Sequence, residues 1–160
     1  MKRTPEAAAL TSLILEVFRL NGQLLMQGDR LTEPLGLTSA RWQVLGSLEL
    51  SDHPISVAQA ARRMGLTRQA VQRVANDLEM LGFTRFENNP DHARAKLIVP
   101  TAKGRKALEL IEKRQIEWSN NLARGINVSQ LSNVIEMLDE LVARCKSMEN
   151  APANQGCTQK

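Results

Sequence analysis

Four arginines lie between residues 62 and 73, at positions 62, 63, 68 and 73, and no carboxylate lies among them. Guanidinium groups pair with phosphate oxygens, so this run has the electrostatic pattern of a nucleic-acid contact. A solvated helix face can have the same composition. The net charge of +4 does not by itself identify a nucleic-acid-binding protein. The spacing of the surrounding residues must therefore decide between a nucleic-acid contact and a solvated helix face.

Two short helices are predicted to position these arginines. Ser56 is the expected N-cap of a helix that reaches about Met64, and Thr67 caps a second helix that ends at Leu81, before Gly82. Gly65 between them can adopt the positive φ of a tight turn. A helix-turn-helix also needs small or apolar residues where its helices pack, and the chain supplies Ala60, Ala61, Met64, Leu66, Val71 and Val74.

The second helix then presents a polar face. With the apolar residues inward, the helical repeat turns outward Thr67, Arg68, Gln69, Gln72, Arg73 and Asn76. Arg, Gln and Asn form bidentate hydrogen bonds with base edges, and Thr67 with the helix N-terminus can hold a phosphate. We interpret this face as a recognition surface for double-stranded DNA. An ordinary helical hairpin with a polar outer face is the alternative.

After Gly82 the pattern changes from helical to extended. Residues 83–87 and 96–99 are predicted strands, and the segment 88–94 between them is rich in turn-forming residues. This pattern indicates a β-wing. Arg94 is expected at its tip or on its return strand, where a guanidinium can enter the minor groove of DNA. A solvent-exposed loop arginine is the alternative.

The remaining pattern is helical, which gives six helices and one hairpin. We expect helices over residues 5–28, from Thr38 with Trp42, Leu45 and Leu48 inward, over residues 101–124, and along the C-terminal region.

The predicted fold is mainly α with a small β-wing: one winged helix-turn-helix domain over residues 1–147, with a DNA-binding lobe at 38–100 and a mobile tail at 148–160. Residues 5–28 and 101–147 are predicted dimerisation helices, and the candidate interface residues are Leu13, Val17, Leu131, Ile135, Leu138 and Val142, with Leu108, Ile111 and Trp118 adding apolar surface.

Residues 38–105 resemble the MarR family of bacterial transcriptional regulators. The matching segments are residues 37–45 (LTSARWQVL), residues 66–73 (LTRQAVQR), and the wing from Asn89 to Thr101 followed by Lys103-Gly104. The resemblance implies a homodimer whose recognition helices enter successive major grooves of a pseudo-palindromic site. It also implies that Arg73 and Arg94 contact DNA. Ser39 and Arg41 are further candidate DNA contacts. A small aromatic ligand would bind between the dimerisation helices and the lobe, with Trp42 and Met26 as candidate contacts.

Three positions depart from the family pattern. Ala93 stands where the family often has a basic residue, His92 where it commonly has Asp, and Asp77 where it commonly has a basic residue. The last two changes suggest one reversed ion pair. We therefore expect Asp77 to lie near His92 or Arg94 and to position the wing.

The sequence thus predicts a cytoplasmic, sequence-specific DNA-binding regulator that acts as a repressor and is released by a ligand. No enzyme, cofactor, metal site or membrane association is expected, because neither His53 nor His92 has neighbours with catalytic spacing and no long apolar segment occurs. Two other functions stay open. One is a winged-helix adaptor that binds protein or RNA, and the other is a redox regulator that uses the thiol of Cys145 or Cys157.

Overall fold

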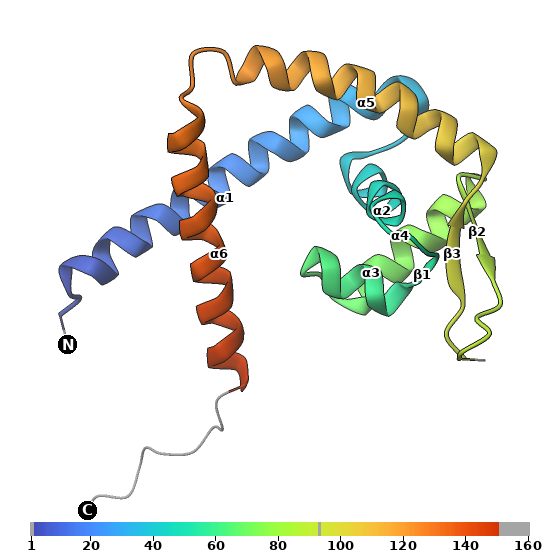
Figure 1. The fold of residues 1–160 in the computed structure, drawn as a ribbon, viewed down its shortest axis with the longest axis horizontal. Coiled ribbons are helices and arrows are strands. Elements are labelled where there is room, and N and C mark those ends of the chain that lie inside the picture. The colour runs from blue at the N-terminus through green and yellow to red at the C-terminus, as the bar shows by residue number, and fades with distance from the viewer. Residues whose placement is uncertain (1, 93, 151–160) are drawn as a thin grey trace, which may run out of the picture. The chain divides into compact units, whose positions relative to one another are not determined.

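The computed structural model describes residues 2–92 and 94–150, and side chains as far as Met148. The chain forms two compact units, residues 1–118 and residues 119 onward (Figure 1). The first unit contains α1 (Pro5–Thr32), a 3-10 turn η1 (Glu33–Leu35), α2 (Ser39–Glu49), β1 (Ile55–Ser56), α3 (Val57–Met64), α4 (Arg68–Met80), β2 (Thr84–Glu87), β3 (Leu97–Pro100) and most of α5 (Ala102–Leu122). The second unit contains α6 (Val128–Asn150). None of the helices described has the length and apolar character needed to cross a membrane.

Local signals place the helix-turn-helix where the sequence predicts it. Ser56 and Gln59 form a capping box at the start of α3, and the Thr67 hydroxyl oxygen accepts the Ala70 N–H at the start of α4. Gly65 joins the helices with φ +63°, in the left-handed region. One interior residue is misassigned: Leu66 is 47% exposed and does not fill the space between the helices.

α1 continues past Gly28, where the sequence suggested its end. Gly28 is buried inside the helix, and a Cβ there would lie 2.5 Å from the Ser39 Oγ. The glycine therefore permits the close approach of α1 and α2. The Asp29 carboxylate accepts the Ser39 N–H at 2.6 Å and fixes this crossing.

The wing belongs to a three-stranded antiparallel sheet of order β1-β3-β2. The hairpin of β2 and β3 was predicted, and Phe86 pairs with Ile98 in it. β1 was not predicted, because its two residues are too short to show an alternating pattern. It pairs Ile55 with Ile98 and thereby attaches the start of α3 to the wing.

One hydrophobic core lies inside the first unit. It contains Leu37, Val44, Leu45, Leu48, Ile55, Val57, Ala60, Ala61, Val71, Ala75, Leu78, Phe83, Ile98, Ala107, Leu108 and Ile111. Leu108 and Ile111 therefore cover the lobe and are not available as dimer surface, contrary to expectation. α5 approaches the residue before β2 so closely that a Cβ on Gly104 would lie 2.1 Å from the Phe83 carbonyl oxygen.

Large apolar side chains remain exposed on the helices predicted to dimerise. On α1, Val17 is exposed and Leu13 is half-buried. On α6, the exposed residues include Leu131, Ile135 and Val142, with Leu138 half-buried. α6 extends to Asn150, past the predicted start of the tail, and residues 151–160 lie outside the described part of the chain.

Candidate nucleic-acid interface

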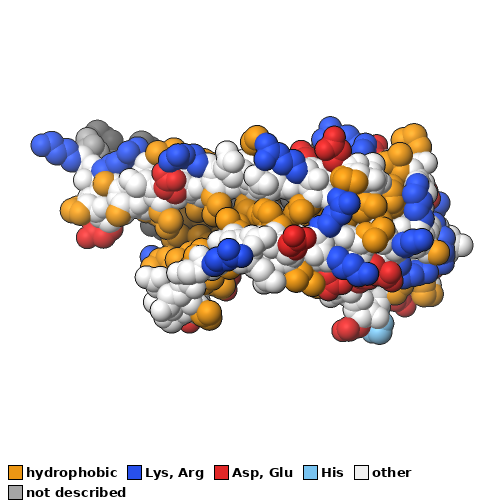
Figure 2. Space-filling view, turned by 90° about the horizontal axis from the view of Figure 1, so that it is seen from above, with side chains coloured by type: hydrophobic (Ala, Val, Ile, Leu, Met, Phe, Trp, Pro, Cys, Tyr) orange, Lys and Arg blue, Asp and Glu red, His pale blue; other side chains and the backbone are white. Residues whose placement is uncertain are grey.

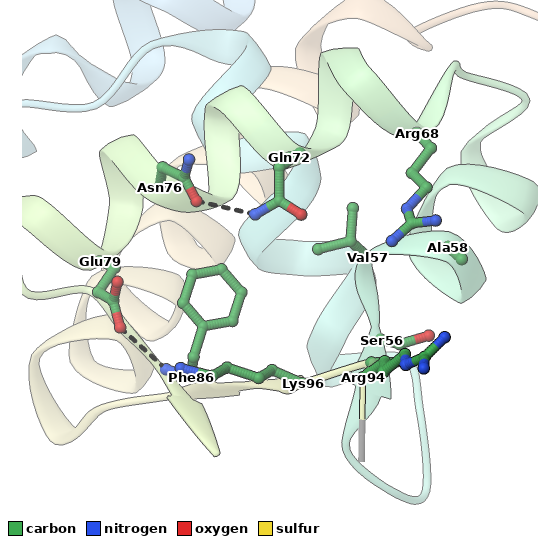
Figure 3. A pocket seen from close by; sticks show the side chains of 11 residues that line it. Ser56, Val57, Ala58, Arg68, Gln72, Asn76, Glu79, Phe86, Arg94 and Lys96 are labelled. Carbon is green, nitrogen blue, oxygen red and sulfur yellow. Dashed lines mark hydrogen bonds between the residues drawn. The ribbon is translucent and has the colours of Figure 1, made fainter. Parts of the chain in front are cut away.

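The polar face predicted for α4 is present. The exposed residues on it are Thr67, Arg68, Gln69, Arg73 and Asn76, and Gln72 is half-buried. The Gln72 Nε2 donates to the Asn76 Oδ1 at 2.8 Å, which orders two amides along the helix (Figure 3). This face therefore offers guanidinium and amide groups, which are the side-chain groups that pair with base edges.

An open hollow of about 450 Å³ separates α4 from the wing. Its lining residues are Ser56, Val57, Ala58, Arg68, Gln72, Asn76, Glu79, Phe86, Arg94, Ala95 and Lys96. Figure 3 shows the Arg68 and Arg94 side chains at the same end of it, near Ser56 and Ala58. Three cationic side chains thus line the same hollow, Arg68 from α4 and Arg94 and Lys96 from the wing. On the surface drawn in Figure 2, Lys and Arg side chains are spread over the right-hand end, where the lobe lies.

The carboxylate that lines this hollow is already engaged. The Glu79 Oε1 accepts the backbone N–H of Phe86 at 3.1 Å (Figure 3). β2 is an edge strand, so this N–H points away from β3 and toward α4. Glu79 therefore joins α4 to the wing through a side-chain hydrogen bond. Sequence reasoning missed it, as it missed Lys96, because an exposed charged residue near a helix end has no distinctive pattern.

Asp77 has a different partner from the one expected. Its Oδ2 lies 3.2 Å from the Nη2 of Arg41 on α2. Within the described residues it forms no ion pair with His92 or Arg94, and Arg94 faces the hollow instead. α2 packs against α4 through core residues, which brings Arg41 to Asp77 from 36 residues away. Ala93, the third departure, lies outside the described residues.

Ser39 is buried, and its side chain is unavailable to DNA. Its Oγ accepts the Gln43 Nε2 at 3.1 Å, and its backbone N–H is held by Asp29. The expected DNA contact by this side chain is therefore corrected to a role in the packing of α1 and α2.

A second cavity, of about 960 Å³, lies between α1, α2, the end of α3 and α5. Trp42 lines it as predicted, but Met26 does not; Met26 is exposed on α1. The apolar lining also includes Leu50, Met64, Leu66 and Leu108. Leu66 thus lines this cavity, which accounts for its exposure.

Comparison with known proteins decides the family. The MarR family model matches residues 35–95. An uncharacterized Mycobacterium tuberculosis protein, Rv2011c, is 39% identical over 138 residues, which cover 86% of this chain and 95% of that protein. The chain belongs to the MarR family. Another relative, the transcriptional activatory protein BadR of Rhodopseudomonas palustris, is 21% identical, and the match covers 89% of this chain and 83% of the BadR chain.

Solved MarR-family structures share this winged helix fold. The M. tuberculosis regulator MOSR, solved in complex with DNA, has a TM-score of 0.70 and 25% identity, over 82% of this chain and 96% of MOSR. CouR from Rhodococcus jostii RHA1, solved with p-coumaroyl-CoA bound, has a TM-score of 0.72 and 19% identity, over 90% and 95% of the two chains. This MarR-family chain is accordingly a DNA-binding transcription regulator.

Proposed function

We propose that this regulator is a homodimeric repressor that reads a pseudo-palindromic DNA site with α4 and is released by a small ligand. The observation that carries the proposal is the polar face of α4, which continues into a cationic hollow beside the wing. Thr67, Arg68, Gln69, Gln72 and Arg73 are the proposed contacts of α4.

The hollow suggests how the wing and α4 contact the same DNA duplex. When α4 lies in a major groove, a sugar-phosphate strand separates it from the minor groove that the wing reaches. The hollow lies between the same two elements, so it is suited to receive that strand. Arg68 and Lys96 would pair with its phosphates, and Arg94 would reach past them into the minor groove. The first N–H groups of α3, at Val57 and Ala58, have no intrahelical partner and favour an anion.

The proposed dimer rests on the exposed apolar residues of α1 and α6. Contiguous apolar surface on a soluble protein usually marks an interaction site. A twofold dimer would bury each of these surfaces against its copy and would present two α4 helices to successive major grooves. A pseudo-palindromic site is the natural match to that symmetry.

The proposed ligand is a small aromatic compound in the cavity lined by Trp42. An aromatic ring there would pack against the indole and the apolar side chains around it. CouR, which shares this fold, was solved with p-coumaroyl-CoA bound, and this supports the proposal of a bound ligand. Binding can be followed by fluorescence in a Trp118→Phe variant, in which Trp42 is the remaining tryptophan.

The test begins with selection of bound duplexes from a random library and measurement of their affinity at several salt concentrations. Arg73→Ala should cost about 1–3 kcal/mol on the selected site and far less on random DNA, because a base-reading contact is lost. Arg68→Ala and Lys96→Ala should weaken both DNAs similarly and reduce the salt slope by about 0.9 each. Lys113→Ala, on the exposed side of α5, is the matched charge control.

Absence of salt-dependent duplex binding would favour the adaptor alternative over DNA reading. Transcription in vitro from a promoter that carries the selected site then gives the sign of regulation. Repression is the expected result, and stimulation would favour activation, as the name of BadR suggests.

A further inference from the structure

Besides Glu79 in the hollow, α4 carries a second acidic residue, Asp77, on its polar face. Asp77 lines a shallow groove along α4 together with Arg68, Gln69, Gln72, Arg73 and Asn76. Its carboxylate pairs with Arg41 of α2 at 3.2 Å, and the two side chains are 29% (Arg41) and 36% (Asp77) exposed. In the proposed function, this carboxylate lies on the surface that the phosphate backbone approaches.

An unpaired carboxylate at this position would oppose DNA binding in two ways. It would repel phosphates directly. It would also attract Arg73, which precedes it by four residues and so lies on the same face of the helix. Two arginines, from α2 and α4, can therefore compete for Asp77. Within the described residues Arg41 holds it, and Arg73 forms no ion pair.

We propose that Arg41 is a positioning residue that holds Asp77 so that Arg73 remains available to DNA. Arg41 acts through Asp77 and does not itself contact the nucleic acid. The inference rests on the proposed function, in which α4 reads DNA, and it replaces the DNA contact expected of Arg41 from sequence.

The arrangement around Arg41 supports an indirect role. Arg41 is half-buried, whereas Arg68 and Arg73 are exposed on the α4 surface. Its guanidinium already donates to Asp77. Leu45 of α2 and Leu78 of α4 are completely buried, so the helices that carry the pair share the core and hold it in a fixed relation.

A double-mutant cycle on the full chain tests the proposal. Affinity for the selected duplex is measured for the wild type, Arg41→Ala, Asp77→Asn and the double variant. Arg41→Ala should bind roughly tenfold more weakly, the usual scale of coupling between residues in contact. Asp77→Asn should bind at least as tightly as the wild type. The double variant should stay within about threefold of Asp77→Asn, because without the carboxylate there is nothing for Arg41 to hold.

Other outcomes overturn the inference. An equal loss from Arg41→Ala in both backgrounds would mean that Arg41 contacts DNA directly, and no loss in either would mean that it has no role. If Arg41→Ala fails to fold in a thermal melt, Asp77→Asn decides alone: tighter or unchanged binding supports the proposal, and weaker binding refutes it. Arg19→Ala, which removes an ion-paired arginine from α1, is the control for net charge.

Arg73→Ala separates this inference from the proposed function. If that variant keeps full affinity, reading of DNA by Arg73 on α4 is wrong. If Arg73→Ala loses affinity, but Asp77→Asn does not remove the loss caused by Arg41→Ala, only the proposed role of Arg41 is wrong.

Discussion

Glu79 offers a sharp test of how the wing is held, because two substitutions separate its hydrogen bond from its charge. Its carboxylate accepts the Phe86 N–H at 3.1 Å and lies beside a hollow that we propose receives a DNA strand. Glu79→Ala removes both the acceptor and the charge. Glu79→Gln removes the charge but keeps an acceptor oxygen.

The cost in stability should be small. A hydrogen bond of this kind contributes about 0.5–1.5 kcal/mol, and the exposed position places Glu79 toward the lower end, since water can replace the lost acceptor. For a chain of 160 residues, a loss of about 1 kcal/mol lowers the melting temperature by roughly 2–4 °C. Glu79→Ala should therefore remain folded at 25 °C.

DNA binding should separate the two variants. Without the anchor the wing samples other positions, so Glu79→Ala should bind the selected duplex about three- to tenfold more weakly, the effect of about 0.7–1.4 kcal/mol of lost positioning. Glu79→Gln should bind as tightly as the wild type or more tightly, because a negative charge near the phosphates is gone. Fluorescence anisotropy with a labelled duplex measures both. Equal strengthening by both substitutions would show that charge alone matters and would refute the anchoring role.

Three further substitutions test the fold and the assembly. Gly104→Ala should destabilise the lobe by about 1–3 kcal/mol in a denaturant titration, because the new methyl group meets the Phe83 carbonyl; an unchanged midpoint would contradict that close approach. Leu138→Glu should give a monomer or an insoluble chain in light scattering, since a buried unpaired charge costs several kcal/mol, and a soluble dimer of unchanged stability would remove α6 from the interface. Asp29→Ala should lower stability by about 1–3 kcal/mol, because the Ser39 N–H loses a charged acceptor, whereas Asp29→Asn should recover part of the loss.

The sequence alone determined the parts of this protein that depend on neighbouring residues. Ser56 and Thr67 start α3 and α4, and Gly65 turns between them, because caps and positive-φ turns are satisfied within a few residues. The polar face of α4 is also a local feature, because it follows from the helical repeat. Family membership was also visible from the order and spacing of these segments, and the comparisons confirm it.

The tertiary structure decided which distant groups meet. The partner of Asp77 is Arg41 because α2 packs on α4, and the wing is tied to α4 by Glu79 because the unpaired edge of β2 faces that helix. Gly28 was mistaken for a helix end. The position requires a glycine because Ser39 packs against it, and Ser39 is too distant in sequence for a local pattern to reveal this. β1 exists only through its pairing with β3. Such contacts depend on how whole elements pack, and no periodicity along the chain records them.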